Sequence, residues 1–586
     1  MIKISSEAQG HLNALWAALG QAHLEEGEYR DLLMRARNLL QSIGAVRGAG
    51  AASLFMGDWD HARQCAANTP EDLAYIAMVQ KDFRLAAQNF EEADLLAHAA
   101  FALFDAGDFP RSRAMWKRVC ERAERKANLY VAGLALYNLS RVCSALKDEV
   151  AARRYAIQSI HRLERAADAY ELSGQRERAF DCFLVVMAIG REGGFENLAE
   201  GYLGCIRILA GDQLRHYVVQ YYEDFLRLAT ERGEHHAAGT LYREAADYSR
   251  DNGLPYAAYY RGQAGEAYIR AAESLEAAGA SAEMVENSLA AAIDCFNALG
   301  LWSRIRSVYE ILSGLELSEK RRSRYLQLAA RVGAIRDVEA KVVGVPDHLR
   351  VSVPYPEVWR SDVIEWEQGG DPAATMMQVA VDPKVPSFSR RRAQTCVLLQ
   401  RAYKEGATLG LPLQMGSELL SRLAELIGNV ETWESLAPLE ALFEDGDYLV
   451  RTSCIDAVGR LYFKRSFQLI SRGVEDDNAQ VRASSIQAIT SLFFPHAYEP
   501  LVRIFRSSQD IAVQTAAIRS LGKIRSSEAV DALLEALRES SSSLHEVIVD
   551  LLVRSEVRTA PEQIRAELDL STGLTRSNLE KVLRAR

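Results

Sequence analysis

Several features that would point away from a helical fold are scarce in this sequence. Only 14 of its 586 residues are proline and 37 are glycine, which excludes a collagen-like or proline-rich chain. The longest apolar run, residues 183–189, is far shorter than the roughly 20 residues that a membrane helix needs. The first residues lack the apolar core of a signal peptide. These absences predict a soluble protein of the cytoplasm.

The eight cysteines are scattered, and no two of them form a Cys-x-x-Cys pair. Most lie inside apolar stretches with helical periodicity. They are Cys65, Cys120, Cys143, Cys182, Cys205, Cys295, Cys396 and Cys454. This arrangement favours reduced, buried thiols over a disulfide framework or a zinc site, as expected in the cytoplasm.

No charge of one sign dominates the chain. It has 69 basic and 79 acidic side chains, a formal net charge of −10 and an isoelectric point near 5.7. This balance argues against a protein that binds nucleic acid by electrostatics alone. With 48% hydrophobic and 25% charged residues, the chain can bury a large core and is long enough for about four average domains.

What the sequence does contain is repetition. In the first half, a small turn closes one predicted helix, an aromatic residue opens the next, and a small residue follows three positions later. The clearest examples are Gly57-Asp58-Trp59 with Ala62, Lys81-Asp82-Phe83 with Ala86, and Gly107-Asp108-Phe109 with Ser112. Glycine accepts the left-handed turn that ends a helix, and aspartate can cap the helix that follows. The small residue lets the two helices approach closely.

This signature resembles the turn between the paired helices of tetratricopeptide repeats, over about residues 50–310. Successive turns at 57, 81 and 107 are 24 and 26 residues apart, shorter than the family spacing of 34. The resemblance therefore implies degenerate helical hairpins that stack into an array.

The second half carries a more regular repeat. Val450, Val481, Val513 and Leu544 are spaced by 31, 32 and 31 residues, and the same register aligns three more apolar columns. These columns are Leu439, Ile470, Val502 and Leu533; Ile455, Ile486, Ile518 and Val549; and Val458, Ile489, Leu521 and Leu552. Four columns held over four units predict stacked two-helix modules.

A polar column accompanies the apolar ones. Asp445 precedes Arg451 by six residues, and Asp476 precedes Arg482 by six. The pattern resembles HEAT repeats, over about residues 430–555. The resemblance implies that these four residues form a structural ladder of charge-assisted hydrogen bonds between neighbouring repeats. The equivalent residues of the next two units are Ser508 and Gln514, then Glu539 and His545. Residues 556–586 are expected to cap the array.

Proline is concentrated in one segment, because six of the 14 prolines lie between 343 and 386. Residues before proline avoid the helical conformation, so an extended chain is expected there, with a short helix around 358–367. We therefore predict a hairpin array over 1–342, a junction over 343–386, and HEAT-like repeats with a C-terminal cap over 387–586.

The chain contains no recognisable catalytic or cofactor motif. The glycine-rich stretch Gly44–Gly50 lacks the lysine and hydroxyl residue of a phosphate loop. The adjacent His235 and His236 point about 100° apart on a helix, so they cannot share one metal ion from a single face. The cysteines have core-like neighbours. We expect no catalytic, cofactor-binding or metal-binding residue, and no cofactor.

Three basic clusters are candidates for docking a phosphate or an acidic partner. The candidate residues are Arg111, Arg118, Arg122 and Arg125 on one helical face, Arg321 and Arg322, and Arg390 and Arg391. The alternative is a set of solvated faces that nearby acidic residues neutralise. Tyrosines gather between 217 and 268, and are explained either by packing between helices or by a concave wall that grips an extended peptide.

Together these patterns predict an all-α, α-solenoid superhelix in two parts. Such arrays present extended concave surfaces. The favoured function is a non-enzymatic scaffold or adaptor for one or more protein partners in a bacterial cytoplasm. Two alternatives remain: a helical-repeat protein that binds or processes nucleic acid, and a regulatory effector of a bacterial stress or defence system with a protease-sensitive junction. A continuous basic groove would favour nucleic acid, and scattered clusters would favour the adaptor.

Overall fold

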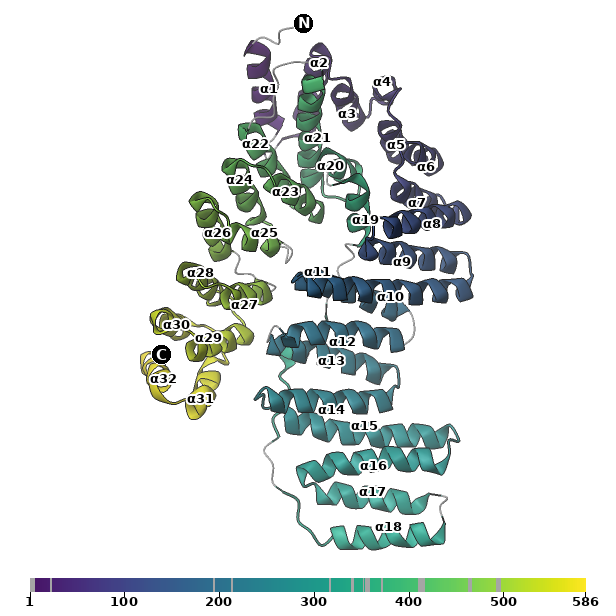
Figure 1. The fold of residues 1–586 in the computed structure, drawn as a ribbon, viewed down its shortest axis with the longest axis vertical. Helices are drawn as coiled ribbons and strands as arrows, with labels where there is room; N and C mark the ends of the chain where they lie inside the picture. Colours follow the sequence, from purple (N-terminus) through teal and green to yellow (C-terminus); the bar gives the residue numbers. More distant parts are fainter. Residues whose placement is uncertain are drawn as a thin grey trace. The chain divides into compact units, whose positions relative to one another are not determined.

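The fold of this computed structural model is an all-α solenoid (Figure 1). The structure describes residues 6–19, 21, 24–192, 195–211, 214–315, 318–338, 342–350, 352–353, 359–369, 372–408, 417–461, 466–491 and 497–586. Over these ranges it contains 32 α-helices and no strand. None of the described helices is both long and apolar enough to cross a membrane.

The chain forms two compact units, and the first is discontinuous in sequence. Unit 1 comprises residues 1–166 and 357–586, and unit 2 comprises residues 167–356. The predicted boundaries at 342 and 387 therefore differ from the division in the structure. The physical reason is that helices from the second half of the chain pack against the first hairpins.

The N-terminal part of unit 1 is a series of helical hairpins. Its helices are α1 (Ser6–Leu19), α2 (Glu26–Ser42), α3 (Val46–Met56), α4 (Trp59–Ala66), α5 (Pro70–Val79), α6 (Phe83–Glu92), α7 (Leu96–Asp105), α8 (Phe109–Arg125), α9 (Leu129–Ala145) and α10 (Glu149–Leu172). The last of these continues across the boundary into unit 2.

The turns of these hairpins have the chemistry that the sequence predicts. Gly57 ends α3 in the left-handed conformation, with φ 80°, and Asp58 caps α4 by accepting the His61 backbone N–H at 3.3 Å. At the next turn Lys81 takes the left-handed conformation, with φ 61°, and Asp82 caps α6. Ala62 and Ala86 are fully buried, so consecutive helices pack closely.

Unit 2 is a second series of antiparallel hairpins followed by an extended segment. Its elements are α11 (Arg176–Glu192), α12 (Phe195–Gly211), α13 (Arg215–Glu231), α14 (His235–Asp251), α15 (Ala257–Ala277), α16 (Ala282–Leu299), α17 (Trp302–Gly314), α18 (Glu319–Val332) and the 3-10 turn η1 (Asp347–Leu349).

The C-terminal part of unit 1 contains the more regular repeats. Its elements are α19 (Trp359–Gln368), α20 (Pro372–Val381), α21 (Ser387–Thr408), α22 (Ser417–Gly428), η2 (Trp433–Ser435), α23 (Leu436–Phe443), α24 (Tyr448–Val458), α25 (Ser466–Val474), α26 (Ala479–Ser491), α27 (Tyr498–Ser507), α28 (Ile511–Leu521), α29 (Ser527–Glu539), α30 (Ser542–Arg554), α31 (Ala560–Leu570) and α32 (Gly573–Ala585).

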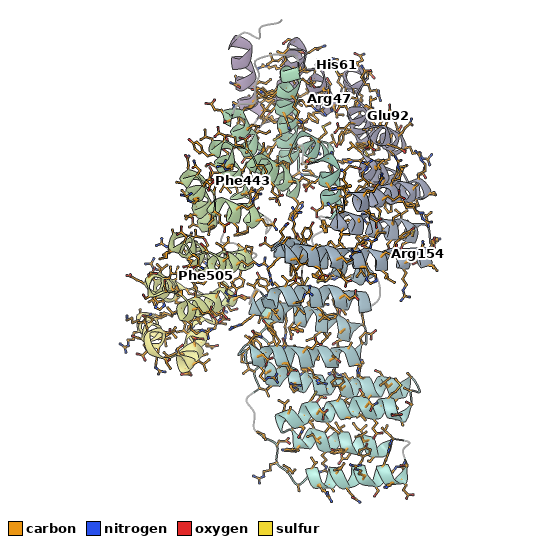
Figure 2. All side chains as sticks on the ribbon, in the orientation of Figure 1. Arg47, His61, Glu92, Arg154, Phe443 and Phe505 are labelled. Carbon is orange, nitrogen blue, oxygen red and sulfur yellow. The ribbon has the colours of Figure 1, made fainter. Side chains whose placement is uncertain are left out.

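The apolar columns of this part form its core. Val450, Val481, Val513 and Leu544 are all buried, as are the columns that begin at Leu439 and at Val458. The column that begins at Ile455 is less uniform, because Ile486 and Val549 are half-buried. Figure 2 marks Phe443 and Phe505, two aromatic side chains in the last turns of the first helices of their repeats, which are also buried.

The predicted proline-rich junction is divided between the two units. Residues 342–350 and 352–353 belong to unit 2, whereas α19 and α20 belong to unit 1. Helix α19 corresponds to the predicted short helix. It packs against α7 and α9, while α20 packs against α5 and α21 packs against α3 (Figure 1). Residues 354–358 and 370–371, which include two of the prolines, lie outside the described residues.

Candidate functional site

The first predicted basic cluster lies on α8 and is largely ion-paired. Arg118 binds Glu91 at 2.5 Å, and Arg122 binds Asp94 at 2.5 Å. Glu91 belongs to α6, and Asp94 belongs to the turn that follows α6. The two ion pairs therefore join α8 to α6 and to that turn. These contacts favour the alternative in which neighbouring acids neutralise the cluster.

The two outer residues of the cluster make weaker contacts. Arg111 lies 4.0 Å from Asp108, and the Arg125 Nε donates to the backbone oxygen of Glu121 at 3.3 Å. The role of the four arginines in docking stays a prediction.

The second cluster, in unit 2, is split between a paired and an unpaired residue. Arg321 binds Glu286 at 3.2 Å, and Tyr325 donates to the same carboxylate. Arg322 is exposed and has no polar side-chain partner in the described part of the chain. The Arg322 guanidinium group is therefore free within the described residues.

The third cluster begins α21 and faces α2. Arg391 binds Glu26, donates to the backbone oxygen of Leu24 at 2.7 Å, and lies over the ring of Tyr29, 4.8 Å from its centroid. Arg390 is half-buried and, within the described residues, has no side-chain hydrogen bond or ion pair. The two adjacent arginines therefore have different surroundings.

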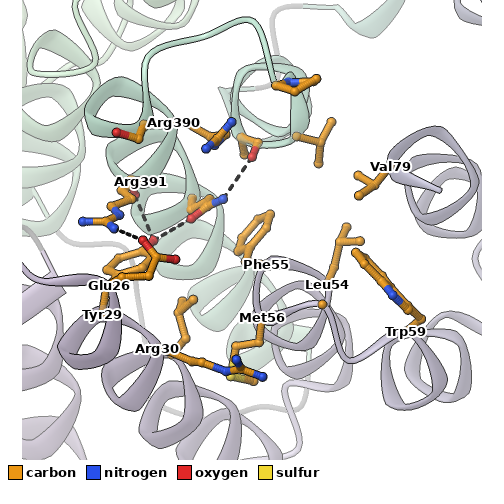
Figure 3. Close-up of a pocket in the computed structure, with 17 residues that line it drawn as sticks. Glu26, Tyr29, Arg30, Leu54, Phe55, Met56, Trp59, Val79, Arg390 and Arg391 are labelled. Carbon is orange, nitrogen blue, oxygen red and sulfur yellow. Dashed lines mark hydrogen bonds and ion pairs between the residues drawn. The ribbon is translucent and has the colours of Figure 1, made fainter. Parts of the chain in front are cut away.

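Arg390 lines a cavity of about 390 Å³ within unit 1, which we call the arginine cleft (Figure 3). Its charged lining residues are Glu26, Arg30, Arg390 and Arg391. Its apolar lining includes Leu54, Phe55, Met56, Trp59, Val79 and Val381. The cleft thus combines three guanidinium groups and one carboxylate with an apolar, aromatic floor.

Helix ends position these side chains. Phe55 and Met56 occupy the last turn of α3, and Trp59 is the first residue of α4. The left-handed Gly57 turn and the Asp58 cap determine where Trp59 begins α4, and Arg37 holds Asp58 at 2.9 Å. Figure 3 shows Trp59 beside Leu54.

Polar contacts fix the opposite wall. The Tyr29 hydroxyl donates to Gln394 at 2.7 Å, and the Gln394 amide donates to the backbone oxygen of Ala380 at 3.0 Å. These bonds connect α2, α21 and α20, so the cleft is held open by a rigid frame. Burial raises the pKa of Tyr29 well above its usual value, which keeps this hydroxyl a hydrogen-bond donor.

A buried ionic cluster lies beside the arginine cleft, between α3, α5 and α21. Asp72 accepts from Arg401 at 2.5 Å and from the Arg47 Nε at 2.8 Å, and Arg401 also donates to the backbone oxygen of Arg47 at 3.2 Å. Asp72 and Arg401 are both buried, and Figure 2 marks Arg47. This cluster joins residues that are 329 positions apart in sequence.

The pKa values follow from this environment. Burial acts to raise the pKa of Asp72, but Arg401 and Arg47 outweigh it and hold that pKa below its usual range. Glu405 accepts the Arg47 backbone N–H at 3.1 Å, and its burial raises its pKa. Asp72 is therefore the ionised centre of the cluster at neutral pH.

A second buried carboxylate caps a helix from a distant part of unit 1. Glu367 on α19 accepts the backbone N–H groups of Ala97, at 2.9 Å, and of His98, at 3.3 Å, and contacts the His98 Nδ1 at 2.9 Å. The Glu367 side chain is 1% exposed. The first turn of α7 therefore receives its cap from α19, because Leu95 at the N-cap position has no side-chain acceptor.

The ladder residues contact each other between consecutive repeats. Arg451 binds Asp476 with two hydrogen bonds, of 2.7 and 3.0 Å, and also donates to the backbone oxygen of Asp445 at 3.0 Å. Arg482 donates to the backbone oxygens of Asp476 and Asp477, at 2.6 and 2.8 Å. At the next repeat, Gln514 donates to the backbone oxygens of Ser508, at 2.9 Å, and Phe505, at 3.4 Å.

Another polar column was missed by the sequence argument. Asp447, Asn478 and Asp510 each accept the backbone N–H two residues later, at 2.9, 2.8 and 2.7 Å, at the start of the second helix of a repeat. Their spacing follows the register of the apolar columns, so it was a detectable signal. Asp72, Glu367 and Arg401 carried no such signal because they do not repeat.

In unit 2, part of the tyrosine-rich region holds an extended segment of the same chain. Leu349 and Val345 of this segment are buried, and the Val353 backbone N–H donates to Asp224 on α13 at 3.1 Å. Arg350 lies over the ring of Tyr259 and donates to its hydroxyl at 2.9 Å.

The same helices supply the acids that hold this segment. Arg350 also binds Glu223 at 3.2 Å, and Asp224 accepts from Tyr202 at 2.5 Å. Burial raises the pKa of Glu223. Of the two interpretations of the tyrosines, packing between helices applies to Tyr260, which is fully buried, and contact with an extended segment applies to Tyr259.

The thiols have no activated environment. Seven of the eight cysteines are buried, and Cys65 is the half-buried one. The Cys65 thiol lies 3.6 Å from the Nδ1 of His61, which is marked in Figure 2. Burial raises the pKa of Cys65, so the thiol is protonated at neutral pH. The described residues contain no group of three or more side chains arranged to hold a metal ion.

Comparison with known proteins gives a family match for one part of the chain. The family model of HEAT repeats matches residues 468–549, from α25 to α30. This range lies inside the region whose columns resemble HEAT repeats. No curated protein matches the sequence.

Two solved structures align with nearly the whole chain. One is a circular tandem repeat protein with novel repeat topology and enhanced subunit contact surfaces, with 14% identity, 99% of this chain and 98% of that chain covered, and a TM-score of 0.13. The other is She4p, with 12% identity, coverages of 99% and 93%, and a TM-score of 0.19. Both TM-scores are low, so neither alignment supports an argument about function.

Proposed function

We propose that this protein is a non-enzymatic scaffold or adaptor that holds protein partners on the surfaces of its helical repeats. HEAT repeats commonly serve as scaffolds for protein interactions, and stacked two-helix modules present long surfaces for docking. The identity of the partner is not implied by the fold, since fold alone does not determine function.

The observation that carries the proposal is the extended segment in unit 2. Val345 is buried against the helices, whereas Val342 and Gly344 are exposed. Further along the segment, Val353 is buried and its neighbour Ser352 is exposed. Alternating buried and exposed side chains, with a backbone N–H bound by Asp224, are how a protein surface grips an extended peptide. The helical wall of this chain therefore has the chemistry that binding a partner's peptide requires.

The distribution of basic residues supports protein partners over nucleic acid. Arg118, Arg122, Arg321 and Arg391 are each bound to a carboxylate. Recognition of a phosphate backbone requires free cations on one face.

The proposal is tested by cross-linking in the native host. A photo-reactive phenylalanine analogue replaces Leu449 or Ile511, which are exposed at the starts of α24 and α28. The control replaces Leu570, which is exposed near the end of α31. We expect adducts to the same protein from both test positions after nuclease treatment, and none from the control. Adducts that form before nuclease treatment and are all removed by it would refute the proposal.

A further inference from the structure

We propose that the arginine cleft docks an acidic segment of a protein partner. Carboxylates of the segment bind Arg30 and Arg390, while an apolar or aromatic side chain packs against Phe55 and Trp59. This inference rests on the adaptor function proposed above and adds the chemistry of the partner.

The charge of the cleft is not balanced by its own residues. Glu26 neutralises Arg391, but neither Arg30 nor Arg390 has a side-chain hydrogen bond or ion pair within the described residues. The chain as a whole has a net charge of −10, and the guanidinium groups of Arg118 and Arg122 are paired. Two free guanidinium groups in one cavity therefore form a local positive site that attracts anions.

The positions of these two groups favour a peptide over a compact anion. Figure 3 shows Arg30 and Arg390 on opposite sides of Phe55. A single phosphate cannot reach across an aromatic side chain to both. A peptide with carboxylates on either side of an apolar residue matches this arrangement, in which Phe55 lies between Arg30 and Arg390. Each guanidinium can bind a carboxylate with two hydrogen bonds.

The floor of the cleft provides an anchor site. Phe55, Met56 and Trp59 are only half-buried, although they lie in the concave part of the surface. Aromatic side chains that line a pocket contribute much of the binding energy at protein interfaces. The cavity volume of about 390 Å³ lies within the range of pockets that enclose a small ligand, so it can enclose part of a peptide.

The frame of the cleft is already in place without a partner. Tyr29, Gln394 and Ala380 are hydrogen-bonded across three helices, and Arg391 ties α21 to Leu24, two residues before α2. A rigid site loses little conformational entropy on binding. The cleft is therefore preorganised for a segment that is itself extended and flexible.

The test is calorimetric titration of the full chain with a designed probe, acetyl-Glu-Glu-Asp-Phe-Glu-Glu-amide. We expect saturable binding with one peptide per chain. The double variant R30Q/R390Q should weaken binding at least tenfold, whereas R322Q, which removes an unpaired guanidinium in unit 2, should leave it unchanged. Thermal melts of both variants establish that they fold. A probe with Ala in place of Phe, or with Gln and Asn in place of the acids, should also bind at least tenfold more weakly.

Several results would overturn the inference. One is that R30Q/R390Q binds the probe as tightly as the wild type does, or that the neutral probe binds as tightly as the acidic one. Another is that no saturable heat is seen at about 1 mM peptide. A further one is complete displacement of the peptide by an equal concentration of inorganic phosphate. The last result would identify a simple anion site. If R30Q/R390Q still captures in the native host the protein that the cross-linking identifies, the adaptor function stands and the cleft is not its docking site.

Discussion

The two repeat arrays of unit 1 are held together in different ways. In the HEAT-like array, the polar link between Arg451 and Asp476 joins consecutive repeats, 25 residues apart. In the first hairpins, the buried links from Asp72 and from His98 run to Arg401 and Glu367, which are 329 and 269 residues away. The HEAT-like array is linked between neighbours in sequence. The first hairpins have such links too, for example from Arg47 to Asp72, but they are also held by helices synthesised much later.

This difference indicates which substitutions should destabilise each array most. An interaction between neighbours is lost one repeat at a time, because solenoid stability is a sum of local terms. A buried charge held by a distant partner affects the packing of every helix around it. Substitutions in the first hairpins should therefore cost more than those in the ladder.

The largest effect is expected from Asp72→Asn. The substitution leaves Arg47 and Arg401 with no carboxylate at their centre, and removing one partner of a buried ionic group costs about 3–5 kcal/mol. We expect a loss of that size in the free energy of unfolding, measured with urea and circular dichroism. The control is Asp60→Asn, because the Asp60 side chain is 91% exposed beside Arg63 and its loss should be barely measurable. Equal losses in the two variants would contradict the assignment.

The next effect concerns the cap on α7. Glu367→Gln removes the charge that accepts the Ala97 and His98 backbone N–H groups and should cost about 2 kcal/mol. Hydrogen exchange should speed up at these two amides more than at the end of α7. Glu92→Gln, on the exposed face of α6 and marked in Figure 2, is the matched control. Unchanged protection of the first turn of α7 would show that the cap is unimportant.

A smaller, pH-dependent effect is expected in the ladder. Hydrogen bonds from Arg451 hold the pKa of Asp476 below its usual range. A lowered pKa contributes stability that is present above the unfolded-state value, about 4, and is lost as the pH falls through the folded-state value.

Asp476→Asn should therefore cost about 1–2 kcal/mol at pH 7, and the difference from the wild type should shrink by pH 2. Unfolding with urea at both pH values measures it. Asp477→Asn, at the adjacent exposed position, should show no such shrinkage. A constant difference between wild type and D476N at both pH values would rule out the ionic contribution.

The smallest effect is a gain. Arg482 has backbone partners but, among the described residues, no carboxylate partner from the next repeat, where Ser508 stands at the ladder position. Ser508→Asp should extend the ladder by one step and stabilise the chain by about 0.5–1 kcal/mol. Ser508→Asn, which lacks the charge, is the comparison, and the gain should disappear in high salt. A loss of stability in S508D would mean that the ladder cannot be extended.

The regular features of the fold could be predicted from the sequence. The columns at Val450, Val481 and Val513 repeat because each repeat buries the same face, so periodicity alone reveals them. The caps at Asp58 and Asp82 are local, and a short stretch of sequence contains both the cap and the helix it starts. The short helix α19 was also predictable, because the prolines on either side of it are close by in the sequence.

The arginine cleft could be predicted only in part. Arg390 and Arg391 were candidates because they are adjacent in a basic run, but Arg30 is an isolated arginine on an ordinary helix. Its role depends on the packing of α2 beside α21, which no local pattern encodes. The pairing of Arg118 with Glu91 likewise depends on how one hairpin stacks on the next.

The discontinuity of unit 1 has a consequence for synthesis on the ribosome. Asp72 emerges long before Arg401, with 329 positions between them. At about 5–20 residues per second, this interval lasts on the order of tens of seconds. During that time the surface of the first hairpins that α19–α21 will cover is open to water and to other molecules. A nascent chain must therefore stay unaggregated with a half-built core, and a fragment that stops before α19 keeps that surface bare.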